Sequence, residues 1–205
     1  MAMKKIILIS SLILSLSAHA FGRSHKKSAP QSPAPQSKTE VSSAQINLPK
    51  DQEVCFSPDE PCDLKLLKFI ESAEKSIDVA VFDINLDQIV HALLVKSKTI
   101  QVRVLVDKRQ SKGPHSLVKT LVKGGVQVRY GSQRGVMHNK FVIVDQKSIE
   151  TGSFNYTNHA CKANQENQIY LVNSSIVDRY LKRFEQSWSK GKEVILDALV
   201  KEDQV

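Results

Sequence analysis

The chain has 205 residues, a charged fraction of 24% and a hydrophobic fraction of 41%. This length suits one domain with appendages, and the composition is that of an ordinary globular protein, which excludes a fibrous or wholly disordered chain. The formal net charge of +8 indicates an anionic partner but does not identify it.

The positive charge is concentrated in one segment. Residues 51–205 hold 22 basic and 20 acidic side chains, yet residues 96–140 within them hold eleven Lys or Arg and a single acid, Asp107. For each lysine taken alone, a solvated surface position is the simpler interpretation. Together these residues predict a basic stripe that leads to a candidate active site, as a polyphosphate backbone requires.

The first twenty residues have the three parts of a secretory signal peptide. Lys4 and Lys5 form a charged start, residues 6–16 form an apolar core, and Ala18-His19-Ala20 is a cleavage site. The apolar run is shorter than the about 20 residues that span a bilayer, although an uncleaved anchor stays open. We expect an exported protein of the periplasm or cell envelope, or a secreted one.

Residues 21–50 are rich in Ser, Pro, Gln, Lys and Ala and have almost no large apolar side chains. Such a segment cannot bury enough surface to offset its ordering entropy, so a flexible tether is predicted. The globular domain is expected at 51–192, followed by a tail at 193–205. The N-terminal segment also offers a route to membrane association.

Two cysteines, Cys55 and Cys62, flank a turn-rich stretch at 57–61. In an oxidising compartment a disulfide between them is favoured over two free thiols, and it stabilises the domain edge by about 2–3 kcal/mol in the chain-entropy model. Cys161 has no evident partner, and its state stays open.

Helical and extended patterns alternate along the globular part. Apolar spacing predicts helices around 64–73, 89–94 and 117–122, the last ended by Gly124-Gly125, and an amphipathic helix over 175–190. Strands are predicted at 77–84, 100–106, 126–130, 141–144, 149–151 and 168–172. The alternation predicts an α/β fold with a mixed, largely parallel sheet sandwiched by helices.

One segment combines the residue types that phosphoryl transfer needs. Its fixed residues are His138, Lys140, Asp145, Gly152, Ser153 and Asn155. On an extended chain, residues i and i+2 point to the same face, so His138 projects with Lys140, and Ser153 with Asn155. A nitrogen nucleophile, a fixed cation and two neutral donors are then able to surround one tetrahedral phosphate.

These six residues match every fixed position of the HxKxxxxDxxxxxxGSxN signature within 18 residues, so the chain resembles the phospholipase D superfamily. From about residue 54 to 191 it is similar to the small single-motif Nuc-type endonucleases, and its exported layout is similar to membrane-associated bacterial nucleases of that type. The resemblance implies a phospholipase D-like fold with one motif per chain.

The resemblance also implies roles for the site residues. His138 is expected to attack phosphorus, while Glu166 accepts a proton from its other ring nitrogen. Lys140, Ser153 and Asn155 are expected to hold the phosphate oxygens.

For several of these residues a structural interpretation is also open. Asp145 and Gly152 are assigned structural roles, since the spacing of Asp145 points its side chain away from the substrate. Glu166 could be an ordinary loop acid, and Ser153 and Asn155 could cap turns.

A second histidine is needed to protonate the leaving oxygen and then to activate water. Two-motif members of the superfamily supply this histidine from a second motif. No second motif begins here at any of the other histidines considered, which are His25, His91, His115 and His159. A symmetric homodimer, with His138 of each subunit facing its mate, is the simplest source. No metal or cofactor is expected, because the sequence has no convincing ligand cluster.

DNA is the expected partner, and single strands are favoured because a phosphate held between two facing histidines must enter a narrow groove. Candidate phosphate contacts are Arg134, Lys108, Arg109 and Lys112. Tyr156 and His159 are candidates for lining the groove, although incidental positions stay open for both. Candidate stacking rings are Phe82, Tyr130, Phe154 and Tyr156.

The sequence therefore predicts a metal-independent, sequence-nonspecific endonuclease that acts through a covalent phosphohistidine. A phospholipase or phosphatidyl transferase is an alternative, against which the single motif and the lack of a long apolar loop argue. A DNA-binding envelope protein that does not cut is another, against which the intact motif argues.

Overall fold

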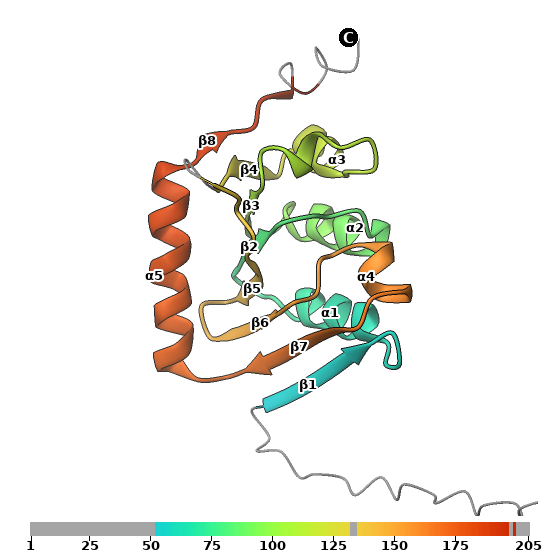
Figure 1. Cartoon of the computed structure of the whole chain (residues 1–205). Coiled ribbons are helices and arrows are strands. Elements are labelled where there is room, and N and C mark those ends of the chain that lie inside the picture. Colours follow the sequence, from blue (N-terminus) through green and yellow to red (C-terminus); the bar gives the residue numbers. More distant parts are fainter. Residues whose placement is uncertain (1–51, 132–134, 197–198, 200–205) are drawn as a thin grey trace, which may run out of the picture. The chain divides into compact units, whose positions relative to one another are not determined.

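A central sheet with helices on both faces forms the structure, a computed structural model that describes residues 52–131, 135–196 and 199 (Figure 1). The expected signal peptide at 1–20, the tether at 21–50 and Arg134 lie outside these residues. The helices are α1 (Cys62–Glu71), α2 (Asp87–Lys96), the 3-10 turn η1 (Gln110–Lys112), α3 (Val118–Lys123), α4 (Asn158–Lys162) and α5 (Ser174–Lys190).

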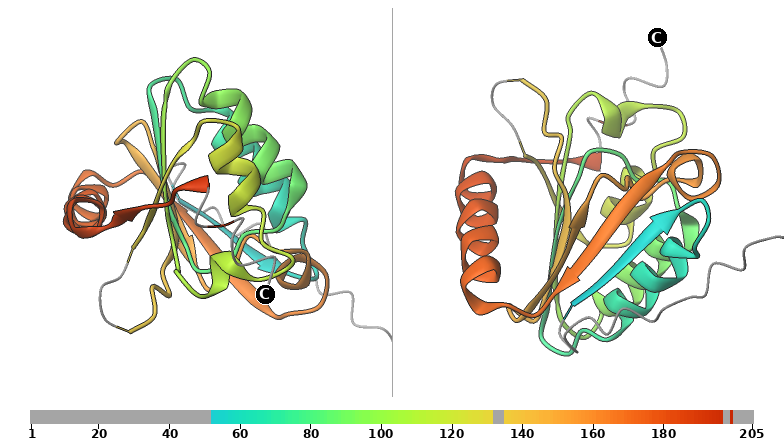
Figure 2. Two further views of the ribbon diagram at one scale, coloured as in Figure 1. Left: turned by 90° about the horizontal axis from the view of Figure 1, so that it is seen from above. Right: turned by 60° about the horizontal axis from the view of Figure 1, so that its bottom comes forward.

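The described residues form eight strands in the spatial order β1-β7-β6-β5-β2-β3-β4-β8. They are β1 (Gln52–Ser57), β2 (Ser76–Val81), β3 (Gln101–Val106), β4 (Gln127–Tyr130), β5 (Lys140–Val144), β6 (Ser148–Gly152), β7 (Glu166–Leu171) and β8 (Lys192–Glu193). The view from above in Figure 2 shows α1, α2 and α3 on one face of the sheet and α5 on the other.

The sheet is mixed, as predicted, but it is not largely parallel. Only the pairs β2·β3 and β3·β4 are parallel among the described strands, and the other five pairs are antiparallel. A parallel pair needs a long crossover, which α2 and α3 provide, whereas β5 and β6 are joined by a short turn. In the sequence, predicted helices separate predicted strands only as far as 126–130, so the prediction of a largely parallel sheet was wrong for the strands that follow.

Two apolar cores explain why the central strands are almost continuously hydrophobic. In β5, Val142 and Val144 pack into the core under α1–α3, while Phe141 and Ile143 pack into the core under α5. Because successive side chains point to opposite faces, a strand covered on both sides needs apolar residues at every position. α5 closes the second core with Val177, Phe184 and Trp188, which confirms the predicted amphipathic helix.

The domain continues past the boundary expected at residue 192. Glu193 pairs with Arg129 in the sheet, and the backbone N–H of Val194 donates to the carbonyl of Val128 at 2.9 Å. Val194 and Leu199 are buried in the first core. Within the described ranges, the helices are all too short or too polar to cross a membrane.

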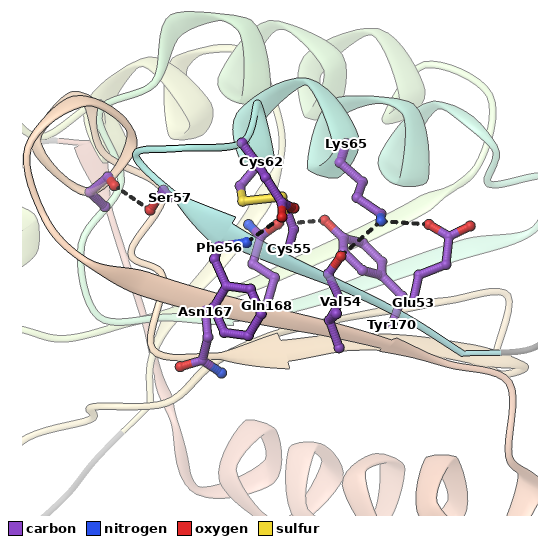
Figure 3. Close-up of a disulfide and its surroundings, with 12 residues drawn as sticks. Glu53, Val54, Cys55, Phe56, Ser57, Cys62, Lys65, Asn167, Gln168 and Tyr170 are labelled. Carbon is purple, nitrogen blue, oxygen red and sulfur yellow. Dashed lines mark hydrogen bonds and ion pairs between the residues drawn. A yellow bond between two sulfur atoms is a disulfide. The ribbon is translucent and has the colours of Figure 1, made fainter. Parts of the chain in front are cut away.

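The predicted disulfide joins Cys55 of β1 to Cys62 at the start of α1, with 5.6 Å between the two Cα atoms (Figure 3). It fixes the first strand, which the sequence pattern did not reveal, to the helix that follows it. Lys65 adds a second link, since its Nζ lies 2.7 Å from Glu53. Cys161 is a half-buried free thiol.

Candidate active site

The motif residues meet at one edge of the sheet, which we call the catalytic edge. There β5 and β7 begin, while β2, β3 and β6 end. The register places Lys140 opposite Val81, and Gly152 opposite Gln168. Antiparallel pairing therefore brings together two halves of the motif that are separated by the β5–β6 hairpin.

His138 lies in the loop before β5, and its side chain is exposed. Its ring packs against that of Phe82, with 4.7 Å between the centroids. The loop is held on both sides of His138: the backbone N–H of Met137 donates to Asp107 Oδ2 at 3.0 Å, and Asn139 accepts from the backbone N–H of Phe82 at 3.0 Å. An exposed imidazole on a fixed backbone is suited to attack an incoming phosphate.

Lys140 is buried directly beside this histidine. Its Nζ donates to the carbonyl oxygen of His138 at 2.7 Å and lies 5.2 Å from the centroid of the Phe82 ring. Burial lowers the pKa of Lys140, and the nearby charge of Glu166 acts in the opposite direction. Since an ammonium group has three donors, the cation keeps hydrogen-bonding capacity for a phosphate oxygen.

Glu166 contacts Ser153 rather than His138 in the described structure. Its Oε2 accepts from the Ser153 hydroxyl at 2.5 Å, and its Oε1 accepts from Asn164 Nδ2 at 2.9 Å. The Ser153 hydroxyl also accepts from the backbone N–H of Asn167 at 3.1 Å. The proton-acceptor role expected for Glu166 toward His138 therefore stays a prediction, while its positioning of Ser153 is visible.

Asn155 follows Ser153 at the catalytic edge and is half-buried. Its Oδ1 atom is buried and has no hydrogen-bond partner among the described residues. Rotating the Asn155 side-chain amide by 180° places Nδ2 where Oδ1 lies now. A phosphate oxygen accepts hydrogen bonds, so it needs this N–H donor. An unsatisfied polar side chain next to Ser153 is consistent with a partner that arrives with the substrate.

Asp145 and Gly152 have the structural positions expected of them. The Asp145 carboxylate lies at the far end of β5 and accepts from the backbone N–H groups of Glu74, Lys75 and Ser76. Burial acts against ionisation, but these backbone hydrogen bonds hold the pKa of Asp145 below its ordinary value. A Cβ atom at Gly152 would lie 2.0 Å from the carbonyl oxygen of Asn167, so only glycine fits between β6 and β7.

Two of the rings predicted to stack on bases are instead core residues. Tyr156 and Phe154 are fully buried, and the Tyr156 hydroxyl donates to Glu150 at 2.8 Å. The alternation that turns Ser153 and Asn155 toward the catalytic edge necessarily turns Phe154 and Tyr156 into the core. The assignment of Tyr156 to DNA binding and of both rings to base stacking was therefore wrong.

The basic segment does not form one continuous stripe. Arg103 is bound to Asp78 and Glu185 under α5, and Arg129 lies over the Trp188 ring. By contrast, Lys108, Arg109 and Lys112 are exposed in the turn after β3, at the catalytic edge. The phosphate contacts expected of Lys108, Arg109 and Lys112 therefore stay a prediction that their exposed position allows.

Sequence reasoning missed the residues that position this turn and the motif loop. Asp107 is buried and accepts from the backbone N–H groups of Arg109, Gln110 and Met137. Asp107 could have been recognised from the sequence, because it is the one acid in the basic segment at 96–140. Asn164, which holds Glu166, gave no such signal.

One group of potential metal ligands occurs in the described ranges, formed by Cys55, Glu60 and Cys62. Both sulfur atoms belong to the disulfide. A bridged sulfur is not the thiolate that binds metals, so this group is a structural link.

Comparison with known proteins gives consistent matches. The family model described as cardiolipin synthase, PLD-like domain, matches residues 66–188. A protein named phospholipase D from Rickettsia prowazekii is 32% identical over 160 residues, which cover 74% of this chain and 76% of the relative. A mitochondrial cardiolipin hydrolase from Xenopus laevis is 34% identical over 127 residues, which cover 62% of this chain and 60% of the relative.

A solved structure agrees with the sequence matches. Nuc, a phospholipase D family member from Salmonella typhimurium, is 28% identical with a TM-score of 0.66, over 70% of this chain and 97% of that protein. The same sheet flanked by helices is thus found in a relative of nearly the same domain length, and the predicted phospholipase D-like fold is confirmed.

Proposed function

We propose that this chain, which belongs to the phospholipase D-like family of phosphodiesterases, is an endonuclease that hydrolyses DNA. The observation that carries the proposal is the turn with Lys108, Arg109 and Lys112. Through Asp107 this turn is hydrogen-bonded to the residue before His138. A basic surface fixed next to the nucleophile suits a strand of phosphates better than a single lipid headgroup.

The proposed reaction has two steps. A ring nitrogen of His138 attacks phosphorus and forms a P–N bond, while the P–O bond to the leaving nucleotide breaks and its oxygen takes a proton from a second histidine. Water then attacks phosphorus, gives its proton to that second histidine and releases His138. Lys140, Ser153 and Asn155 stabilise the negative charge on the oxygens in both steps, so no metal ion is required.

The second histidine is proposed to come from His138 of a symmetry-related subunit. Inside the described part of one chain, the ring in contact with His138 is that of Phe82. The exposure of His138 leaves it accessible to a partner subunit, and a two-fold axis through the site supplies the missing group without a second motif.

The proposed substrate is single-stranded DNA. The proposed location of the protein is outside the cytoplasm. Phe82 and Tyr130 are half-buried residues that follow or end strands at the catalytic edge, which suits a role in base stacking. The disulfide fits an oxidising compartment, as does the leader expected at 1–20. Equal cleavage rates for one oligonucleotide in single- and double-stranded form would remove the strand preference.

A lipid phosphodiesterase is the second candidate, favoured by the names of the relatives and by Val136, which is 56% exposed two residues before His138. The two candidates are separated by incubating the protein in excess EDTA with labelled single-stranded DNA and, in parallel, with vesicles of phosphatidylcholine and cardiolipin. We expect DNA cleavage and no headgroup release. The reverse result would establish the lipid enzyme.

The nucleophile is tested with a His138→Ala variant of the whole chain. It should bind DNA like the wild type but lose cleavage by several orders of magnitude, since a covalent step has no substitute for its nucleophile. Wild-type enzyme quenched in alkaline detergent should carry labelled phosphate, because the P–N bond of a phosphohistidine is stable in base and is hydrolysed in acid. Unchanged cleavage by the variant would refute the role of His138.

A further inference from the structure

A second polar feature lies beside the catalytic edge, a groove of about 660 Å³ between α4 and the segment before α3. We call it the α4 groove. Its polar lining residues are Asn85, Asp87, His115, Asn158, His159 and Lys162. None of them belongs to the phosphate-binding set described above.

Two chain segments run from the catalytic edge directly into this groove. One leads from Phe82 to Asn85, and the other from Asn155 to Asn158. They lie side by side, because the backbone N–H of Tyr156 donates to Asp83 at 3.1 Å and that of Asn85 donates to Tyr156 at 2.8 Å. Three residues span at most about 10 Å, so the groove begins within a short length of nucleic-acid backbone from His138.

The walls of the groove are fixed by hydrogen bonds. The backbone N–H of Asn158 donates to Asn85 Oδ1 at 2.9 Å, and the Thr157 hydroxyl accepts from the backbone N–H of Ala160 at 3.2 Å. On the opposite wall, the backbone N–H of Leu117 donates to Ile84 at 3.0 Å. The groove is therefore already formed in the unbound chain, which lowers the entropic cost of binding.

The donors in the groove suit an anionic chain. Lys162 carries an exposed ammonium group, and the imidazoles of His115 and His159 each offer an N–H donor. The Asn158 amide donates one N–H to the Asn85 carbonyl at 3.3 Å and keeps its second N–H. Asp87, in the first turn of α2, is the one acid among the lining residues. The donors of the groove therefore outnumber its single acid, which suits the oxygens of a phosphodiester.

We infer that the α4 groove binds the phosphodiester backbone of the DNA strand next to the bond that is cut. This inference rests on the proposed nuclease function and extends it, because it makes the substrate a chain of several linked phosphates. A substrate with a single phosphodiester would occupy the catalytic edge without reaching Lys162. The groove should therefore affect long substrates and leave short ones unchanged.

The test compares a long and a short substrate on full-chain variants. Lys162→Gln removes the positive charge from the groove, a double His115→Ala, His159→Ala variant removes its imidazole donors, and Lys182→Gln removes an exposed lysine from α5 on the other face of the sheet. We expect Lys162→Gln to weaken binding of a single-stranded oligothymidylate by about 3- to 5-fold in the His138→Ala background. The plot of the logarithm of the DNA-binding constant against the logarithm of the salt concentration should become less steep by about 0.7, because one phosphate contact is lost. In the active enzyme, kcat/KM for bis(p-nitrophenyl) phosphate should stay unchanged.

Each outcome decides the inference. It is overturned if Lys162→Gln weakens DNA binding no more than Lys182→Gln, or if it slows bis(p-nitrophenyl) phosphate hydrolysis as much as DNA cleavage. It is also overturned if the His138→Ala chain binds no DNA. A third outcome separates the two proposals. If DNA binding needs Lys162 but the enzyme hydrolyses bis(p-nitrophenyl) phosphate and never cuts DNA, DNA binding in the α4 groove is supported and the proposed nuclease activity is refuted.

Discussion

Glu166 links two groups that bind phosphate in our proposal. It accepts from the Ser153 hydroxyl, and its charge opposes the effect of burial on the Lys140 pKa. A lysine must be protonated to neutralise a phosphate, so a negative charge beside a buried lysine keeps it functional at higher pH. The position of Glu166 thus has a role that does not depend on direct contact with His138.

This role predicts the pH profile of Glu166→Gln. Without the carboxylate charge, burial acts unopposed and the pKa of Lys140 falls further, so the alkaline decline of kcat/KM should begin at lower pH. The measurement is kcat/KM for bis(p-nitrophenyl) phosphate against pH, with Glu71→Gln, an exposed helix residue, as control. A shift of the acid limb alone would instead support a proton-accepting contact with His138.

Glu150 is a second carboxyl group with an unusual environment. It is fully buried, its Oε2 accepts from the Tyr156 hydroxyl, and its Oε1 has no partner among the described residues. Burial raises its pKa to about 8, although the hydrogen bond from Tyr156 acts against this. The folded protein therefore holds a proton on Glu150 in a range where the unfolded chain has released it.

This proton predicts how stability depends on pH. Between the unfolded pKa of about 4.3 and the folded pKa, the folded state binds more protons, so the free energy of unfolding falls as pH rises. Across that window the loss is roughly 3–5 kcal/mol as an upper estimate. Glu150→Gln should flatten this slope in urea unfolding at pH 5, 6.5 and 8. Parallel pH dependences for variant and wild type would contradict the prediction.

At the scale of elements, β1 is an edge strand, paired only with β7 among the described strands. Figure 3 shows the disulfide joining it to α1, while Phe56 lies next to Asn167 of β7. The register places Ser57 opposite Glu166, so the end of this strand supports the carboxylate that contacts Ser153. The disulfide therefore stabilises a strand that borders the catalytic edge.

Removing the disulfide should loosen this strand selectively. Replacing Cys55 and Cys62 by serine should lower the free energy of unfolding by about 2.5 kcal/mol, and amides of β1 should exchange hydrogen faster than those of β2. Wild-type protein with reductant should behave like the variant, and the variant should not respond to reductant. Uniform exchange across the sheet would show that β1 is not held by this link.

At the scale of the whole molecule, a shared active site predicts how mixed subunits behave. If each site needs His138 from both subunits, a dimer with one His138→Ala subunit is inactive. Co-expression of equal amounts should then leave about a quarter of the wild-type activity instead of half. Mixing with the Lys182→Gln variant is the control. A linear dependence on the wild-type fraction would exclude the shared site.

Much of the fold followed from local patterns. The apolar runs, the amphipathic pattern of α5 and the glycines after α3 each depend on neighbours in sequence, and the helices and strands lie where these signals occur. Gly125, for example, has a φ of 87°, the left-handed conformation that ends a helix. β1, α4 and β8 are short or lie at an edge, so they carry too little periodic signal to be recognised.

The motif predicts phosphodiester chemistry without knowledge of the fold, because its six residues occupy two short extended segments whose side-chain directions are set by local geometry. How the two segments meet, and which residues surround them, depends on the folded chain. The contact of Glu166 with Ser153, the hydrogen bond from Met137 to Asp107 and the ion pair of Arg103 with Glu185 depend on how distant segments pack. These in turn result from the packing of distant apolar surfaces, which no short stretch of sequence specifies.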